Sequence, residues 1–170
     1  MKNSRRYKIE IFGLSNDAHQ FSFEYDESFF SEFENSLIIR GNGTCNVDLV
    51  KSDSMLDLTL KVTGFIELTC DRSLDTFDYP ISFRQEIIYK YGDEEKELSE
   101  NVFVVPKNTQ EINISNFLYE YISLEVPMKK LHPRFENDED SDELIYSSKE
   151  ENESTERTDP RWEALKKLKK

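Results

Sequence analysis

Apolar and polar residues alternate most regularly between residues 56 and 91. The even positions from 56 to 70 are apolar apart from Gly64, and the odd positions from 77 to 91 carry most of the apolar side chains that follow. A period of two is typical of a strand with one buried face. The change of phase across residues 71–73 predicts a β-hairpin whose two apolar rows share one face of a sheet.

The alternation also suggests how the strands pair. A hairpin that turns near Ser73 would place Leu60 opposite Ile87, so that an even apolar row meets an odd one. A strand over 45–49 would pair with the same long strand and place Cys45 opposite Leu60. The expected result is a three-stranded antiparallel meander with one apolar face.

The length of these strands predicts a curved sheet. A strand of about fifteen residues would span roughly 50 Å, so it must twist or bend, and Gly64 and Pro80 are the expected bend points. Asp26 or Ser28 can cap a short helix, and Ser115 can cap a second one that covers the apolar face. The predicted fold class is α+β, with a strongly twisted, barrel-like antiparallel β-meander covered by one or two helices.

The chain is acidic, with a formal net charge of −13 from 35 acidic and 22 basic side chains. Such a protein repels nucleic acid at long range unless a local basic patch opposes this effect. Low hydrophobicity and high charge predict a disordered acidic linker over 134–158. Asp159 as N-cap and Pro160 at the first helical position then predict a short helix. The predicted organisation is an α+β domain over 1–133, the linker, and a basic C-terminal helix over 159–170.

The C-terminal helix has a narrow apolar stripe flanked by basic residues. A helix of about ten residues is marginal alone in water, so it needs a surface to pack on. It either packs on its own domain or docks on a partner or on RNA, with its lysines on phosphates. The candidate binding residues are Arg161, Trp162, Leu165, Lys166, Lys167, Leu168, Lys169 and Lys170, with Arg72 at the hairpin turn as a lesser candidate.

The sequence lacks the patterns that several classes of protein require. The sequence has no set of nucleophile, base and orienting group, no glycine-rich phosphate loop and no HExxH motif, so no enzyme, cofactor or small-molecule substrate is expected. The N-terminus lacks the apolar core of a signal peptide, and no apolar run reaches membrane-spanning length. A soluble, cytoplasmic protein is therefore expected.

Cys45 and Cys70 are both expected on the apolar face, where a free cysteine packs as a small hydrophobe. The strand pairing described above places them too far apart for a disulfide. Cys70 and Ser73 have the spacing of a metal knuckle whose second thiol is replaced. A tetrahedral zinc site needs four ligands, and two cysteines with two histidines at unpaired spacings do not supply them. No metal is expected, and Cys70 is the one candidate ligand.

Three stretches of the sequence form distinctive motifs. They are Gly64-x-Ile66-x-Leu68-x-Cys70-Asp71-Arg72-Ser73-Leu74, Pro127-Met128-Lys129-Lys130-Leu131-His132, and Asp159-Pro160-Arg161-Trp162-x-Ala164-Leu165-Lys166-Lys167-Leu168. The first resembles the hairpin motif of the YceD-like proteins, called large ribosomal RNA subunit accumulation proteins, and the other two, with the apolar helix that Pro127 ends, agree in order and spacing. The resemblance covers the chain from about residue 20, and the terminal motif looks like that of the Bacteroidetes-type branch.

The resemblance implies a non-enzymatic factor needed for accumulation or processing of the large-subunit ribosomal RNA. Many members of the family carry a second cysteine where this chain has Ser73, and a further cysteine pair after the position of His132. Because this chain lacks those cysteines, a zinc or redox role does not carry over to it.

Two mechanisms are consistent with the sequence. In the first, the protein engages large-subunit ribosomal RNA or a precursor particle through its basic C-terminal helix and Arg72. In the second, it escorts a basic ribosomal protein, whose charge the acidic stretch over 136–156 neutralises. No membrane partner is expected in either.

Overall fold

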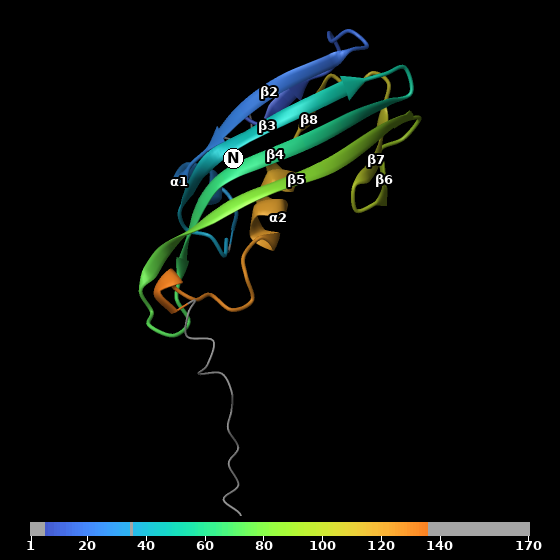
Figure 1. The fold of residues 1–170 in the computed structure, drawn as a ribbon. Coiled ribbons are helices and arrows are strands. Elements are labelled where there is room, and N and C mark those ends of the chain that lie inside the picture. Colours follow the sequence, from blue (N-terminus) through green and yellow to red (C-terminus); the bar gives the residue numbers. More distant parts are fainter. Residues whose placement is uncertain (1–5, 35, 136–170) are drawn as a thin grey trace, which may run out of the picture. The chain divides into compact units, whose positions relative to one another are not determined.

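A computed structural model describes residues 6–34 and 36–135. Its main sheet has six strands in the spatial order β2-β3-β4-β5-β7-β6 (Figure 1). All neighbours pair antiparallel except β5 and β7, which run parallel. The strands are β2 (Ala18–Tyr25), β3 (Gly41–Lys51), β4 (Met55–Thr69), β5 (Thr76–Gly92), β6 (Lys96–Ser99) and β7 (Val102–Pro106).

The remaining elements are short. Strand β1 (Lys8–Glu10) pairs with β8 (Glu111–Asn113) in a separate two-stranded sheet. Helix α1 (Glu27–Phe30) follows β2, helix α2 (Ser115–Leu124) follows β8, and a 3₁₀ turn covers Pro133–Phe135. Figure 1 shows α2 and the small sheet on the same side of the main sheet. None of the helices in the described ranges is long and apolar enough to cross a membrane.

The long central hairpin is confirmed. The apolar residues at even positions of β4 are buried, and their neighbours at odd positions point to the other face of the sheet. Strand β5 continues the pattern with its apolar side chains at odd positions. The α+β class is confirmed as well, because a large sheet carries its core on the face that the helices cover.

Both predicted registers are wrong by two residues. Leu60 pairs with Gln85 rather than Ile87, and Cys45 pairs with Val62 rather than Leu60. Alternation fixes only which face a residue occupies, so a shift of two residues keeps every side chain on its predicted face. The turns decide the register, and a hydrogen bond from the Cys70 N–H to the Asp75 carbonyl (2.9 Å) closes the β4–β5 turn one residue earlier than predicted.

A buried tyrosine packs against two facing glycines of the main sheet. Gly43 of β3 pairs with Gly64 of β4, and a Cβ atom on either would collide with the Tyr25 side chain and with backbone atoms. The two glycines therefore make room for Tyr25, which is almost completely buried. Burial raises the pKa of Tyr25 to about 12. Pro80, the other predicted bend point, faces Phe65 on the adjacent strand.

The sheet does not close into a barrel within the described ranges. Strands β2 and β6 lie at its two edges and do not pair with each other. The helices and the small sheet already cover the apolar face, so burial of the core does not need closure. The acidic segment after β5 contains strand β6, whose four residues are all exposed.

The two helices begin differently. The Asp26 carboxylate accepts hydrogen bonds from the backbone N–H groups of Ser28 (3.0 Å) and Phe29 (3.3 Å), so it caps α1 as predicted. The prediction that Ser115 caps α2 is wrong. Ser115 is the first helical residue, and its N–H donates to the Asn113 side chain (2.9 Å). An asparagine side chain is as good an acceptor as a serine hydroxyl, and the sequence pattern could not separate the two.

Candidate functional site

The turn between β4 and β5, residues 70–75, is called the hairpin tip below. A backbone hydrogen bond from Leu74 N–H to the Cys70 carbonyl (2.9 Å) tightens it. Leu74 itself has a φ of 61°, in the left-handed region that residues with a Cβ atom seldom adopt, and its side chain is exposed. Such backbone strain persists only where the surrounding structure holds it in place.

The chain segment that holds the tip consists of residues 128–135 and is called the clamp segment. The Asp71 N–H donates to the Lys130 carbonyl (2.8 Å), and the Lys130 N–H donates to the Asp71 carboxylate (2.8 Å). The Arg134 guanidinium forms an ion pair with Asp75. The Ser73 hydroxyl lowers the pKa of Asp75 most, and the Arg134 guanidinium lowers it further. Two reciprocal hydrogen bonds and one ion pair therefore join segments about 60 residues apart.

Cys70 lies where the tip meets the clamp segment. Its side chain is completely buried, and its sulfur accepts a hydrogen bond from the His132 N–H (3.3 Å). Burial acts to raise the pKa of this thiol, but hydrogen bonds from the Ser73 hydroxyl and from the backbone N–H groups of His132, Ser73 and Arg72 outweigh it and lower the pKa to about 7. The Ser73 hydroxyl is itself buried beside the thiol.

The residues around Cys70 do not fit a metal ion. The Ser73 hydroxyl stands at the second ligand position of the knuckle, and the His132 ring nitrogen Nδ1 accepts the Arg134 N–H (3.2 Å). In the described part of the chain, no group of three or more His, Cys, Asp or Glu side chains is arranged to hold one. Hydrogen bonds and ion pairs tie the hairpin tip to the clamp segment at this position.

Two arginines flank an aromatic ring beside the tip. The guanidinium carbons of Arg72 and Arg134 lie 4.6 Å and 4.8 Å from the centre of the Phe135 ring. Guanidinium groups bind phosphate oxygens through several donors and stack on planar rings, including nucleic-acid bases. The tip and the clamp segment together hold four basic and two acidic side chains, a local surplus of two positive charges in a chain of net charge −13.

The sequence predictions for this site meet the structure only in part. Arg72 lies on the tip, exposed, as predicted. The predicted binding residues Arg161, Trp162, Leu165, Lys166, Lys167, Leu168, Lys169 and Lys170, and nearly all of the predicted linker, lie outside the described residues. Sequence reasoning missed Lys130, Arg134 and Phe135 as partners of the tip. The signal available was their basic and aromatic character, within the Pro127 motif for Lys130 and directly after it for Arg134 and Phe135. Nothing in local periodicity links these residues to the hairpin.

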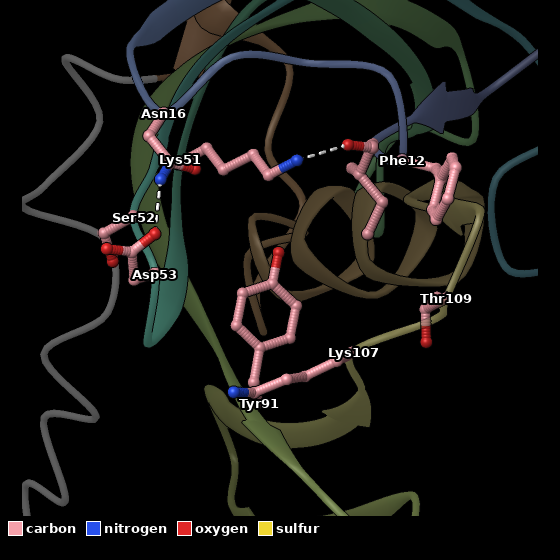
Figure 2. A pocket seen from close by; sticks show the side chains of 9 residues that line it. Phe12, Asn16, Lys51, Ser52, Asp53, Tyr91, Lys107 and Thr109 are labelled. Atoms are coloured by element: carbon pink, nitrogen blue, oxygen red, sulfur yellow. Dashed lines mark hydrogen bonds between the residues drawn. The ribbon is translucent and has the colours of Figure 1, made fainter.

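A small pocket near the N-terminus has a structural explanation. Figure 2 shows Lys51 reaching toward the loop after β1, where its Nζ donates to the carbonyls of Ile11 (2.9 Å) and Leu14 (2.8 Å). On the rim, the Asn16 amide donates to Asp53 (2.5 Å). The Lys51 ammonium group thus holds this loop in place.

The fold and the hairpin tip define an α+β domain with an open main sheet. Polar contacts tie the end of its longest hairpin to the clamp segment. The family model described as large ribosomal RNA subunit accumulation protein YceD matches residues 58–169, which is 112 of the 170 residues. The chain belongs to this family, and the family name links it to accumulation of the large-subunit ribosomal RNA. Comparisons with curated proteins and with solved structures gave no match.

Proposed function

We propose that the protein is a non-enzymatic ribosome biogenesis factor that binds large-subunit ribosomal RNA or a precursor particle in the cytoplasm. The observation that carries the proposal is the pair of arginines around Phe135 on an otherwise acidic chain. Membership of the family supplies the ribosomal context.

The chemistry of the tip suits an RNA backbone. Arg134 is held in position by Asp75 and by the Phe135 ring, and the Arg72 guanidinium also lies over that ring. A phosphate group accepts hydrogen bonds from guanidinium groups, and an unpaired base can stack on their planes. The basic C-terminal residues would add further phosphate contacts.

A salt titration tests this proposal. In this experiment, binding of the full-length protein to fragments of large-subunit ribosomal RNA is measured at several salt concentrations. The slope of log K against log salt counts the phosphates that are neutralised. We expect Arg72→Gln to weaken binding and reduce this slope by about one. Replacement of Lys166, Lys167, Lys169 and Lys170 by Gln should have a larger effect.

The matched control is Arg84→Gln, which removes an exposed arginine from the middle of β5, where it pairs with Glu86. RNA binding should be unchanged in this variant. If wild-type protein does not bind the fragments at low salt, or if Arg84→Gln weakens binding as much as Arg72→Gln, the proposed contact is wrong.

The second candidate function is an acidic escort for a basic ribosomal protein. The observation that favours it is the strong excess of acidic side chains, which complements such a client. A pull-down that recovers a ribosomal protein after nuclease treatment would support the escort. Loss of that protein with nuclease would favour the RNA contact. Sucrose-gradient fractionation of a lysate would show whether the protein travels with precursor or mature subunits.

A further inference from the structure

A cavity of about 530 Å³ opens between the end of β5, the β6–β7 pair, β8 and α2. This volume lies within the range of sites that bind small ligands or single side chains. The cavity is far from the hairpin tip, since Thr76 and Tyr89 are separated by roughly 40 Å along β5 at about 3.3 Å per residue. Figure 1 shows the β6–β7 pair and the β4–β5 turn at opposite ends of the sheet.

Three aromatic rings from three different elements form one wall of the cavity. Phe103 of β7 lies 5.5 Å from Tyr89 of β5 and 5.0 Å from Phe117 of α2, measured between ring centres. Phe103 and Phe117 are partly exposed toward solvent, whereas Tyr89 is only 6 % exposed. An accessible aromatic cluster of this kind offers the negative ring faces to which cations bind.

The Tyr89 side chain is largely buried, lines the cavity, and makes no hydrogen bond through its hydroxyl within the described part of the chain. Burial, and to a smaller extent the Tyr121 hydroxyl and the Glu95 carboxylate, raise the pKa of Tyr89. Tyr89 therefore keeps its proton under physiological conditions. A hydroxyl in this position is a polar group that a ligand inside the cavity can satisfy.

Acidic side chains form the rim. Glu95, Glu97 and Glu111 line the cavity together with a single base, Lys96. Glu111 is paired with Lys8, whereas Glu95 and Glu97 make no ion pair among the described residues. The surrounding segment over 93–100 holds five acids and one base. The rim thus attracts positive charge and repels RNA.

We propose that this cavity binds a lysine or arginine side chain presented by an extended basic segment of a protein partner. The carboxylates of Glu95 and Glu97 attract the charged end, and the rings of Phe103 and Phe117 contact the side chain. The three acids argue against RNA as the occupant, and a purely apolar peptide would leave them without a role. The site is distinct from the proposed RNA contact, so the inference goes beyond that function and does not depend on it.

Binding of a labelled peptide to the full-length protein tests the proposal. The probe is a twelve-residue peptide of alternating arginine and glycine, followed by fluorescence anisotropy, with a citrulline–glycine peptide as the uncharged comparison. We expect the arginine peptide alone to bind. The double variant Glu95→Gln/Glu97→Gln should weaken its binding about tenfold and flatten its dependence on salt.

Two further variants separate a specific site from general charge attraction. Glu24→Gln/Glu86→Gln makes the same charge change on the sheet face opposite α2, where both side chains are exposed, and should leave binding within about twofold. Phe103→Leu keeps the cavity apolar but removes a ring, and should weaken binding about three- to tenfold.

The proposal is wrong if the two charge-change variants weaken binding equally, because attraction would then be non-specific. It is also wrong if Phe103→Leu binds the peptide as the wild type does. Ribosomal RNA binding by Glu95→Gln/Glu97→Gln should remain at least as strong as in the wild type. This readout separates failure at the cavity from failure of the RNA proposal.

Discussion

The two cysteines show how differently the centre of the sheet and the hairpin tip treat the same side chain. Both are completely buried and neither forms a disulfide. Burial in the apolar core raises the pKa of the Cys45 thiol to about 12. At the tip, hydrogen bonds overcome burial and lower the pKa of the Cys70 thiol to about 7. Burial alone therefore does not decide the chemistry of a thiol, because the polar groups around it can reverse the effect.

The difference reflects two kinds of contact that hold the centre of the main sheet and the hairpin tip in place. Near Cys45, apolar side chains pack against Tyr25 and the glycines beneath it. Near Cys70, backbone and side-chain hydrogen bonds and ion pairs connect the tip to the clamp segment. The centre is held by packing and the tip by polar contacts, so perturbations of the two regions should differ in size and in their dependence on pH.

The largest effect is expected at the centre. Gly64→Ala places a Cβ atom against the Tyr25 side chain and the Asn42 carbonyl, and we expect it to lower the free energy of unfolding by about 2–3 kcal/mol. Urea denaturation measures the change. The control is Gly13→Ala, since nothing lies within 4 Å of a Cβ atom at that position, and its effect should stay within about 0.5 kcal/mol. Equal effects at the two glycines would contradict the packing described for Tyr25.

A smaller effect is expected at the clamp. Asp71→Ala removes the acceptor for the Lys130 N–H and should cost about 1 kcal/mol in the same measurement, because both groups are partly accessible to water. Asp71→Asn keeps an acceptor oxygen and should cost less. An equal loss in the two variants would show that charge, rather than the hydrogen bond, holds the clamp.

The third effect concerns pH. Because the pKa of Cys70 in the folded protein lies below the ordinary thiol value of 9.0, its stabilising contribution is fully present above that value and is lost as the pH falls through about 7. The stability of the wild type should rise between pH 7 and pH 9, and Cys70→Ala should remove this rise. Urea titrations at several pH values measure it.

Cys45→Ala is the matched control for that measurement. It should lower stability by leaving a cavity but keep the rise between pH 7 and pH 9, because the Cys45 thiol stays protonated there in the folded protein. An identical pH slope in the wild type and in Cys70→Ala would refute the hydrogen-bonded description of the tip.

The sequence predicted the central hairpin because fifteen alternating residues leave little freedom for another structure. It could not set the register, since a shift of two residues satisfies the same alternation, and only the turn geometry at Cys70 and Asp75 decides. The sequence also could not predict the parallel pairing of β5 with β7, because this pairing depends on how the chain returns after β6.

For the candidate site, local sequence patterns located Arg72 but not the residues that lie beside it. Arg72 was recognisable at a predicted turn. Its neighbours Arg134 and Phe135 come from a segment about 60 residues later, and no short-range rule connects the two. The cavity near α2 is assembled in the same way from β5, β7 and α2, so its three rings had no common signal in the sequence.

The open edge at β6 has a consequence for the behaviour of many copies of the protein together. An unpaired strand edge is a template on which another chain can add, and long apolar edges lead to aggregates. Strand β6 has only four residues, all exposed, with Lys96 and Glu97 among them. Charged side chains on so short a strand disfavour the addition of a neighbouring copy, so this edge protects the protein against self-assembly at high concentration.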